Sequence, residues 1–266
     1  MSEDEYARRG IDLDKPNPAR VYDYILGGRL NYAVDRMFAD QVLAAQPNAR
    51  ERAQLNRQWL RRAIRFGMDH GIRQFLDIGS GMPTVGHVHE VAHAIDPTAR
   101  VVYVDNEPVA VAHSEIVLED NENAVMVHAD AEFPDDVLEH ETTEMMLDLD
   151  QPVMVVMALF VHFIPDERDP ARLISAYRDA LAPGSYLAMS SATPEQQSDG
   201  TARAVAMYQK SANPVTPRTA DELRALVDGF EILDPGIVFI PEWRPDEALP
   251  ANPAECGGLA LVARKN

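Results

Sequence analysis

The sequence predicts an α/β fold in which helices cover both faces of a mostly parallel sheet. Short apolar runs alternate with helical patterns from about residue 73 onward, which is typical of parallel strands joined by helical crossovers. The run 152–160 is apolar throughout, as expected of a central strand buried on both sides. A glycine turn follows the first strand and an acidic residue ends the second, which indicates a nucleotide-binding unit.

The N-terminal part is expected to be helical and to precede this unit. Residues 1–16 have a loosely ordered pattern, and Asn17 followed by Pro18 is typical of a helix N-cap and first turn. Gly27 and Gly28 would end that helix. Two further helices are expected near 34–46 and 49–70, the second with an apolar stripe.

The remaining chain supplies the strands and helices of the α/β unit. The strand candidates are 73–78, 100–105, 124–128, 152–159, 185–191, 230–240 and 258–264. The helix candidates are 84–95, 107–119, 134–147, 169–182, 200–211 and 219–228. We therefore expect a helical extension at 1–70 and one compact domain at 71–266.

Composition limits the classes of function. A hydrophobic share of 46% in 266 residues is enough for a packed core. No apolar run reaches about 18 residues, so no membrane span is expected, and the acidic start does not resemble a secretory signal. The single cysteine, Cys256, favours a reducing, cytoplasmic setting. A net charge of −19 would repel phosphate backbones, so nucleic acid is not an expected partner.

The glycine turn carries the most specific signal. It begins with Asp77 and contains Gly79, Ser80 and Gly81, and the next strand ends at Asp105. Glycines allow a ligand to approach the backbone, and an acid at the next strand tip can accept from both ribose hydroxyls. The neighbouring Asn106 is placed to cover the edge of an adenine, so the pattern predicts an adenosine-containing ligand.

The charge of the turn distinguishes between such ligands. In the dinucleotide fingerprint a third glycine would replace Thr84, and Asp77 would repel a pyrophosphate. S-adenosylmethionine has a sulfonium and an ammonium group and no phosphate, so this carboxylate favours it. The third strand ends with Asp130 and Ala131, where the carboxylate could accept from the adenine amino group. Helix capping is the alternative for each acid, and a nicotinamide oxidoreductase is the alternative enzyme.

With these residues in view, the sequence resembles the class I S-adenosylmethionine-dependent methyltransferases, and most closely an uncharacterised actinomycete S-adenosyl methyltransferase family. The resemblance covers nearly the whole chain and rests on Pro18–Gly28 with Asn31 and Asp35, Asp77–Thr84, Val104–Pro108, His162–Asp166 and Pro241–Pro245. It implies a Rossmann-like sheet of seven strands with an antiparallel last strand. The class usually has a third glycine where this chain has Pro83.

The resemblance also implies that the N-terminal helices form a lid over the cofactor, S-adenosyl-L-methionine. The lid-side candidates for cofactor binding are Arg20, Tyr22, Tyr24, Gly28 and Asn31. Ordinary helix packing is the alternative for the two tyrosines.

A competing motif lies in the helix candidate 84–95. His89 and His93 with Glu90 match H-E-x-x-H, which in zinc hydrolases places two imidazoles on one helix face. Val88 and Ala92 should pack on the sheet and leave both histidines at its margin. We therefore expect no metal, with the zinc hydrolase as the weaker alternative.

The sequence contains few candidates for the chemistry of methyl transfer. His162 follows the central strand and could act as a base, although it could equally bond only to its own loop. Met207, Tyr208, Glu242 and Trp243 lie in segments that commonly form acceptor pockets in this class, and they favour a small, partly apolar acceptor. A protein that binds the cofactor without transferring its methyl group is the remaining alternative.

Overall fold

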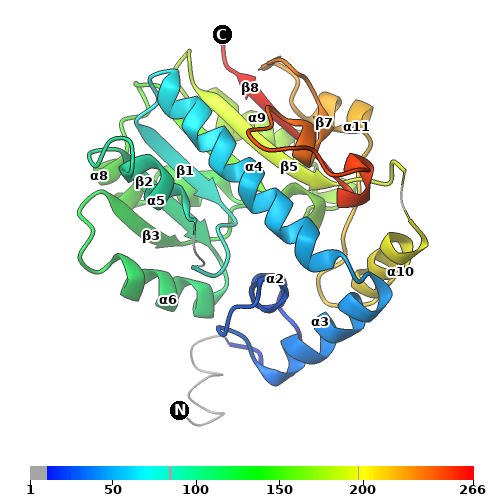
Figure 1. Ribbon diagram of the computed structural model, residues 1–266. Helices are drawn as coiled ribbons and strands as arrows, with labels where there is room; N and C mark the ends of the chain where they lie inside the picture. Colours follow the sequence, from blue (N-terminus) through cyan, green and yellow to red (C-terminus); the bar gives the residue numbers. More distant parts are fainter. Residues whose placement is uncertain (1–10, 84–85, 197) are drawn as a thin grey trace.

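A sheet of eight strands lies at the centre of the computed structural model, which describes residues 11–83, 86–196 and 198–266 (Figure 1). The strands are β1 (Gln74–Ile78), β2 (Arg100–Asp105), β3 (Ala124–His128), β4 (Met154–Ala158), β5 (Tyr186–Ala192), β6 (Glu231–Ile232), β7 (Val238–Phe239) and β8 (Gly258–Arg264). Their order is β3-β2-β1-β4-β5-β8-β6, and β7 also pairs with β8. Strands β1 to β5 are parallel and β8 runs antiparallel to β5, so the predicted Rossmann-like sheet with an antiparallel last strand is confirmed.

The expected sixth strand, 230–240, is interrupted. It forms only the short β6 and β7, both paired antiparallel with β8. Pro235, which lacks an amide hydrogen, and Gly236, with φ +93°, separate the two pieces. The sheet therefore has eight strands where seven were expected.

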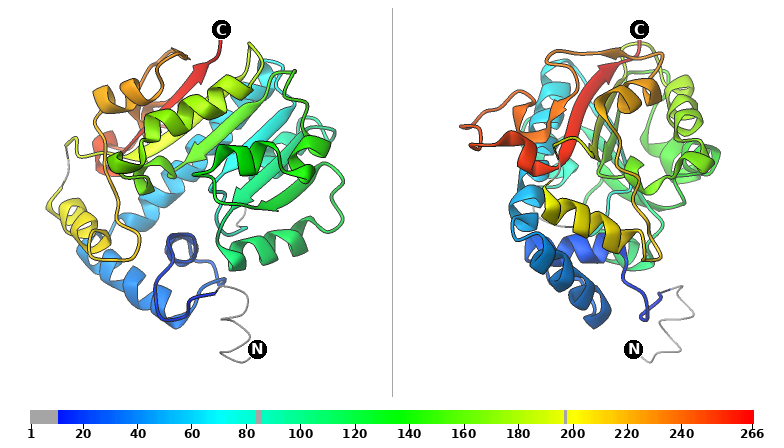
Figure 2. Two further views of the ribbon diagram at one scale, coloured as in Figure 1. Left: turned by 180° about the vertical axis from the view of Figure 1, so that it is seen from behind. Right: turned by 90° about the vertical axis from the view of Figure 1, so that its right-hand side faces the viewer.

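Helices cover the two faces of the sheet separately (Figure 2). One face packs against α4 (Ala49–Asp69) and α5 (Val88–His93), and the other packs against α7 (Pro134–Leu138), α9 (Pro170–Ala180) and α11 (Ala220–Leu226). Successive side chains of β1 point to opposite faces of the sheet. Phe75 packs in the core with α4 and α5, while Leu76 and Ile78 pack in the core with α7, α9 and α11. The other helices of this part are α6 (Pro108–Leu118) and α8 (Glu141–Met146).

Two helix candidates differ from the structure. The expected helix 134–147 is divided into α7 and α8, since the His140 side chain accepts from the Thr142 amide and starts a new helix. The expected helix 84–95 is shorter in the structure, because His87, with an extended ψ of 163°, is the N-cap of α5 (Val88–His93), while Thr84 lies outside the described residues.

A small helical layer covers the carboxyl ends of the parallel strands (Figure 1). It consists of α2 (Pro18–Leu26), α3 (Ala33–Ala45), the first half of α4, and α10 (Asp199–Tyr208), which share one apolar core. Asn17 caps α2 by accepting from the amides of Ala19 and Arg20, and Gly27 ends it with φ +91°, as predicted. The second half of α4 packs in the core of the sheet, so this helix belongs to both parts of the molecule. The expected boundary between a helical extension and a compact domain at residue 70 stays a prediction.

No helix among the described residues has the length and apolar character that crossing a bilayer requires.

Candidate active site

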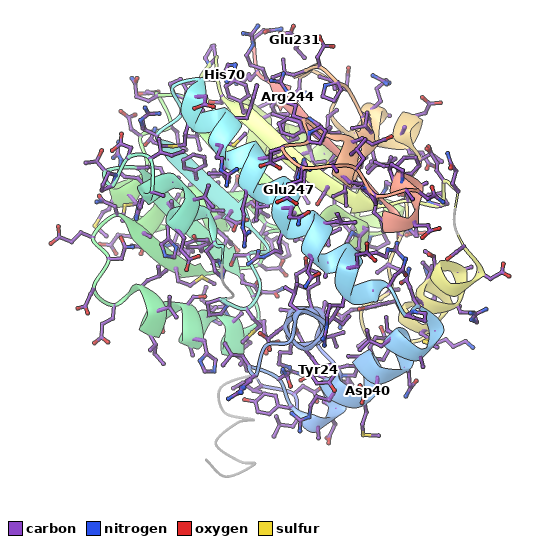
Figure 3. The ribbon with its side chains drawn as sticks, in the orientation of Figure 1. Tyr24, Asp40, His70, Glu231, Arg244 and Glu247 are labelled. Carbon is purple, nitrogen blue, oxygen red and sulfur yellow. The ribbon has the colours of Figure 1, made fainter. Side chains whose placement is uncertain are left out.

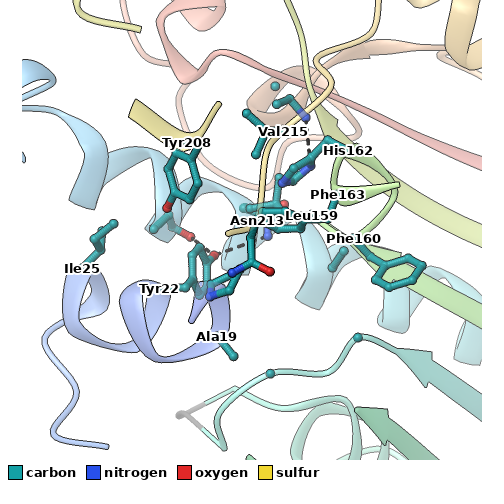
Figure 4. A pocket seen from close by; sticks show the side chains of 18 of the residues that line it. Ala19, Tyr22, Ile25, Leu159, Phe160, His162, Phe163, Tyr208, Asn213 and Val215 are labelled. Atoms are coloured by element: carbon teal, nitrogen blue, oxygen red, sulfur yellow. Dashed lines mark hydrogen bonds between the residues drawn. The ribbon is translucent and has the colours of Figure 1, made fainter. Parts of the chain in front are cut away.

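A cavity of about 530 Å³ lies between the carboxyl ends of the parallel strands and the helical layer (Figure 4). The turns after β1, β2, β3, β4 and β5 all contribute to its wall, as do α2, α3, α4 and α10. Parallel α/β sheets bind ligands at this edge, because the strand order places several loop tips together there.

The glycine turn forms one wall of this cavity. Gly79 and Gly81 have φ of +66° and +69°, a backbone region that favours glycine. The Gly79 amide donates to the Val104 carbonyl at 2.9 Å, and the Gly81 amide donates to Asp105 Oδ2 at 2.7 Å. A Cβ added to Gly79 would lie 2.5 Å from the Phe160 ring. The turn is therefore fixed between β2 and the loop after β4.

Asp77, at the end of β1, is a buried carboxylate that lines the cavity. No described residue donates a hydrogen bond to it. Burial raises its pKa to about 7, with a smaller upward contribution from Asp105 and an opposing effect of Arg57. Buried carboxylates are normally paired, so this arrangement suits a ligand that brings a cation.

Asp105 and Asp130 line the same side of the cavity, together with Ser80, Asn106 and Ala131. Asp105 Oδ1 accepts from the Glu107 amide at 2.8 Å and Oδ2 from the Gly81 amide at 2.7 Å, so the backbone orients the carboxylate and leaves part of its acceptor capacity unused. Burial raises the pKa of Asp105, and the backbone amides of Glu107, Gly81 and Asn106 oppose the shift. Every sheet-edge residue predicted from the sequence therefore reaches one cavity.

The lid-side candidates divide into two groups. Tyr22 lines the cavity, and its hydroxyl donates to the Ala53 carbonyl at 3.1 Å. Arg20 is buried in ion pairs away from the described wall, and Tyr24 donates to Asp40 on the outer side of the helical layer (Figure 3).

Gly28 and Asn31 contact Asp23, a cavity residue that was not among the candidates from the sequence. Asp23 lines the cavity, and its Oδ2 accepts from the Leu30 amide and from Asn31 Nδ2, both at 2.8 Å. A Cβ on Gly28 would lie 1.9 Å from Asp23 Oδ1. Neither Gly28 nor Asn31 is among the described wall residues, but Asn31 bonds to the Asp23 carboxylate and Gly28 leaves room for it.

His162 lies in the short helix η1 (Val161–Phe163) and lines the cavity. Its Nδ1 accepts from the Ala192 amide at 3.4 Å, which assigns the ring proton to Nε2 in the neutral form. Burial, assisted by the charge of Arg218, lowers the pKa of His162 to about 3. Arg218 also donates to the carbonyls of Val161 and Ile164, so it fixes the loop that carries the histidine.

A polar network supports the end of β4. Leu159 has a left-handed φ of +54°, and its amide donates to Ser190 Oγ at 3.0 Å. Ser190 Oγ donates to Asn56 Oδ1 at 2.8 Å, and Asn56 also lines the cavity. The sequence contains no signal for the Leu159 conformation, whereas a buried asparagine within the apolar stripe of α4 could have been noticed.

Only one of the four acceptor-side candidates lines the cavity, and that is Tyr208. Trp243 is fully buried against Phe66, with ring centroids 5.7 Å apart. Glu242 accepts from the Phe239 amide, and Met207 packs in the core of the helical layer.

The side chains of the H-E-x-x-H motif form hydrogen bonds with nearby groups of the chain. His89 Nδ1 lies 2.7 Å from the Tyr103 hydroxyl, and His93 Nε2 lies 2.8 Å from the Ala99 carbonyl. Glu90 accepts from the amides that precede α5. The described part of the chain contains no group of three side chains that could hold a metal, so nothing here supports a zinc hydrolase.

Comparison with known proteins decides the family. The family model described as S-adenosyl methyltransferase matches residues 4–266. The chain belongs to this family. It is therefore an S-adenosylmethionine-dependent methyltransferase, and S-adenosylmethionine is its cofactor.

Solved structures agree with the family assignment. A crystallised candidate methyltransferase from Thermobifida fusca is 37% identical, with a TM-score of 0.92 over 97% of each chain. A DUF574 family protein from Streptomyces avermitilis is 35% identical, with a TM-score of 0.92 over 96% of this methyltransferase and 99% of that chain. Human N-acetylserotonin methyltransferase, crystallised with S-adenosylmethionine, has a TM-score of 0.51 at 15% identity over 99% of this chain and 65% of that one, and shares the fold. The comparison with curated proteins gives no match.

Proposed function

We propose that this methyltransferase transfers the methyl group to a small molecule that binds in the same cavity as the cofactor. The observation that carries the proposal is the division of the cavity wall. Acidic residues line the part at β1, β2 and β3, while mostly apolar residues line the part under α2, α3, α4 and α10. The first part suits the cofactor and the second suits the acceptor.

The residues at the glycine turn fit S-adenosylmethionine. Asp77 would bind the ammonium group of its methionine end, since this carboxylate is buried and receives no hydrogen bond from a described residue. Asp105 has lone pairs left for the ribose hydroxyls, and Asn106 with Asp130 would meet the adenine edge. The cofactor supplies a methyl group on an electron-poor sulfur. The protein contributes by aligning the acceptor and excluding water.

The acceptor part of the cavity has the character of a small-molecule site. One face of α10 contributes Thr201, Ala204 and Tyr208, and α2 contributes Tyr22 and Ile25 (Figure 4). These side chains are apolar or aromatic with few polar groups, as is usual in pockets for small ligands. The helical layer encloses them, and enclosure favours a small acceptor over a macromolecule.

We assign His162 the role of a hydrogen-bond donor to the acceptor. With a pKa of about 3 the ring is neutral at pH 7, and it is a weak base there. Its Nδ1 is engaged by the Ala192 amide, so the proton lies on Nε2. A neutral Nε2–H can hold an oxygen or nitrogen acceptor in line with the methyl group.

A labelled-methyl screen tests the proposal. The purified protein is incubated with methyl-labelled S-adenosylmethionine and the small-molecule extract of an actinomycete, and labelled products are identified by mass spectrometry. We expect a labelled small molecule with the wild-type protein and with the exposed-site control Asp150→Asn, and about a tenfold slower reaction with Asp77→Asn. Cofactor binding by calorimetry without a labelled product would contradict the proposal and favour a non-catalytic sensor.

A further inference from the structure

Arg52 places a cation in the acceptor part of the cavity. It lies on α4, is half-buried and lines the wall together with Gln46 and Thr201. Its Nε donates to the Cys256 carbonyl, and its Nη1 donates to Thr201 Oγ1 at 3.0 Å. A Cβ added to Gly257 would lie 1.5 Å from its Nη2. The guanidinium is thus held against the chain just before β8 and is tied to α10.

This cation has no carboxylate partner among the described residues. Other buried arginines, such as Arg20 and Arg218, form ion pairs with carboxylates, whereas no described carboxylate pairs with Arg52. Burial lowers the pKa of Arg52 to about 10, so the group remains charged at pH 7. A partly desolvated cation without a counter-ion destabilises the ligand-free protein, and an anion in the cavity would remove that penalty.

The guanidinium has hydrogen-bond capacity left for such an anion. It carries five N–H groups, and the two bonds to Cys256 and Thr201 use two of them. Three N–H groups therefore remain on Nη1 and Nη2, while a carboxylate needs two for a bidentate contact. Gln46 supports the arrangement, because its Nε2 donates to the same Thr201 Oγ1 at 3.0 Å.

Arg52 lies away from the acidic strand tips of the cavity. Asp77, Asp105 and Asp130 follow β1, β2 and β3, and the charge of Arg57, which also lines the wall, acts on Asp77, whereas Arg52 lies beside the turn that enters β8. In a chain of net charge −19, a local cation is needed for an anion to stay in the cavity. Apart from Gln46 and Thr201, which orient the guanidinium, the wall of this part includes the apolar residues Val42, Ala49, Ala204 and Val205.

We propose that the methyl acceptor is a small carboxylic acid with an apolar body, and that Arg52 binds its carboxylate. This inference rests on the proposed function and names the substrate class of the same cavity. The apolar body would lie along α3, α4 and α10, so that its reactive atom points toward the acidic part where the cofactor is expected. Arg52 is then a specificity residue for the acceptor.

The test compares carboxylates with neutral amides of the same shape. Benzoate, phenylacetate and 3-phenylpropionate, and their primary amides, are titrated by calorimetry into the full-length protein saturated with S-adenosylhomocysteine. For at least one pair we expect the carboxylate to bind about tenfold more tightly than its amide. Failure of every carboxylate to bind more tightly than its amide overturns the inference.

Variants separate binding from a purely structural role. Arg52→Gln should lose the preference for the carboxylate, Arg52→Lys should keep part of it, and the exposed-site control Arg224→Gln should keep all of it. If Arg52→Gln does not fold, Thr201→Val, which removes one group that orients the guanidinium, should reduce the preference instead. A lowered melting temperature with an unchanged preference in the Arg52 or Thr201 variant means a structural role and overturns the inference.

The affinity for S-adenosylhomocysteine is measured first for each protein. If the wild type does not bind it, the proposed function fails at the cofactor. If it binds while the carboxylate preference is absent, only the inference about Arg52 fails.

Discussion

Arg20 donates from Nη1 to the Glu107 carboxylate at 2.9 Å, although the two residues lie 87 positions apart in the sequence. Both are buried, and Glu107 follows closely after Asp105 and Asn106. Arg20 Nε also donates to Asp35 at 2.9 Å. One guanidinium therefore joins α2 and α3 to the loop that we expect to bind the ribose.

We predict that Arg20→Gln lowers the free energy of unfolding by about 3 kcal/mol, because it leaves Asp35 and Glu107 as buried carboxylates without their cation. The same change should weaken binding of S-adenosylhomocysteine, since α2 loses its connection to the β2 loop. Urea denaturation and calorimetry measure the two effects.

The matched control for this change is Arg224→Gln. Arg224 is exposed on α11, so its loss should change the free energy of unfolding by about 0.5 kcal/mol or less. Equal stability of the Arg20 and Arg224 variants would mean that the ion pair with Glu107 does not hold the helical layer in place.

We predict that Asp77→Asn weakens binding of S-adenosylhomocysteine at pH 8 by about tenfold, since an amide cannot pair with the ammonium group. The pKa of Asp77 is about 7, so the wild-type affinity should fall as the pH is lowered from 8 to 6, because protonation removes the charge. The affinity of the variant should be less dependent on pH. Asp150→Asn, at an exposed loop position, serves as the control, and a wild-type affinity that is constant over this range would contradict the assignment.

The change Asp77→Asn should weaken cofactor binding but stabilise the cofactor-free protein. The pKa of Asp77 is raised from 3.8 to about 7 by folding, so its stabilising contribution is complete below pH 3.8 and is lost as the pH rises through 7. The cofactor-free Asp77→Asn protein should therefore be more stable than the wild type at pH 8, on the order of 2 kcal/mol, with a smaller advantage at pH 5. Urea midpoints at both pH values measure this difference, and an advantage that does not grow with pH would contradict it.

Two glycines of the turn allow a matched comparison. Both have positive φ, so alanine is strained by about 1–2 kcal/mol at either position. A Cβ on Gly79 would also lie 2.5 Å from the Phe160 ring, whereas the nearest described atom to a Cβ on Gly81 is 3.8 Å away, in Ala19. We expect Gly79→Ala to be the less stable variant and to bind S-adenosylhomocysteine more weakly in calorimetry. The opposite order would mean that Phe160 moves aside easily.

The sheet-edge part of the site could be predicted from the sequence because topology places it. Once β1, β2 and β3 are recognised as parallel strands, Asp77, Asp105 and Asp130 must meet at one edge. No side-chain packing has to be known for that step. Pro235 lies within the expected strand 230–240 and is a sequence signal for the interruption. The two pieces, β6 and β7, are too short to show a strand pattern of their own.

The helical layer could not be predicted to the same degree. Helix α2 has 9 residues, and its sequence does not fix which side faces the sheet, so Tyr22 reaches the cavity while Tyr24 points outward. Arg20 was a ligand candidate only through the family resemblance, and no local pattern pairs it with Asp35 and Glu107, which lie 15 and 87 positions away. The positive φ of Leu159 depends on hydrogen bonds made by Ser190, which no local pattern reveals.

The last prediction concerns His162, where sequence and geometry suggest different chemistry. A base would give the rate a dependence on pH near the ordinary pKa of histidine, about 6.5. The pKa of this ring is lowered to about 3 by burial and by Arg218, so the kcat profile should show no step due to His162 between pH 5 and 8. His162→Ala should lower kcat by about tenfold through loss of one hydrogen bond, with cofactor affinity unchanged.

His162→Gln keeps an N–H donor and should therefore be faster than His162→Ala. Both rates are measured with an acceptor from the labelled-methyl screen. A step near pH 6.5 that disappears in His162→Gln would restore the base role, and an equal loss of rate and cofactor affinity in His162→Ala would exclude both roles.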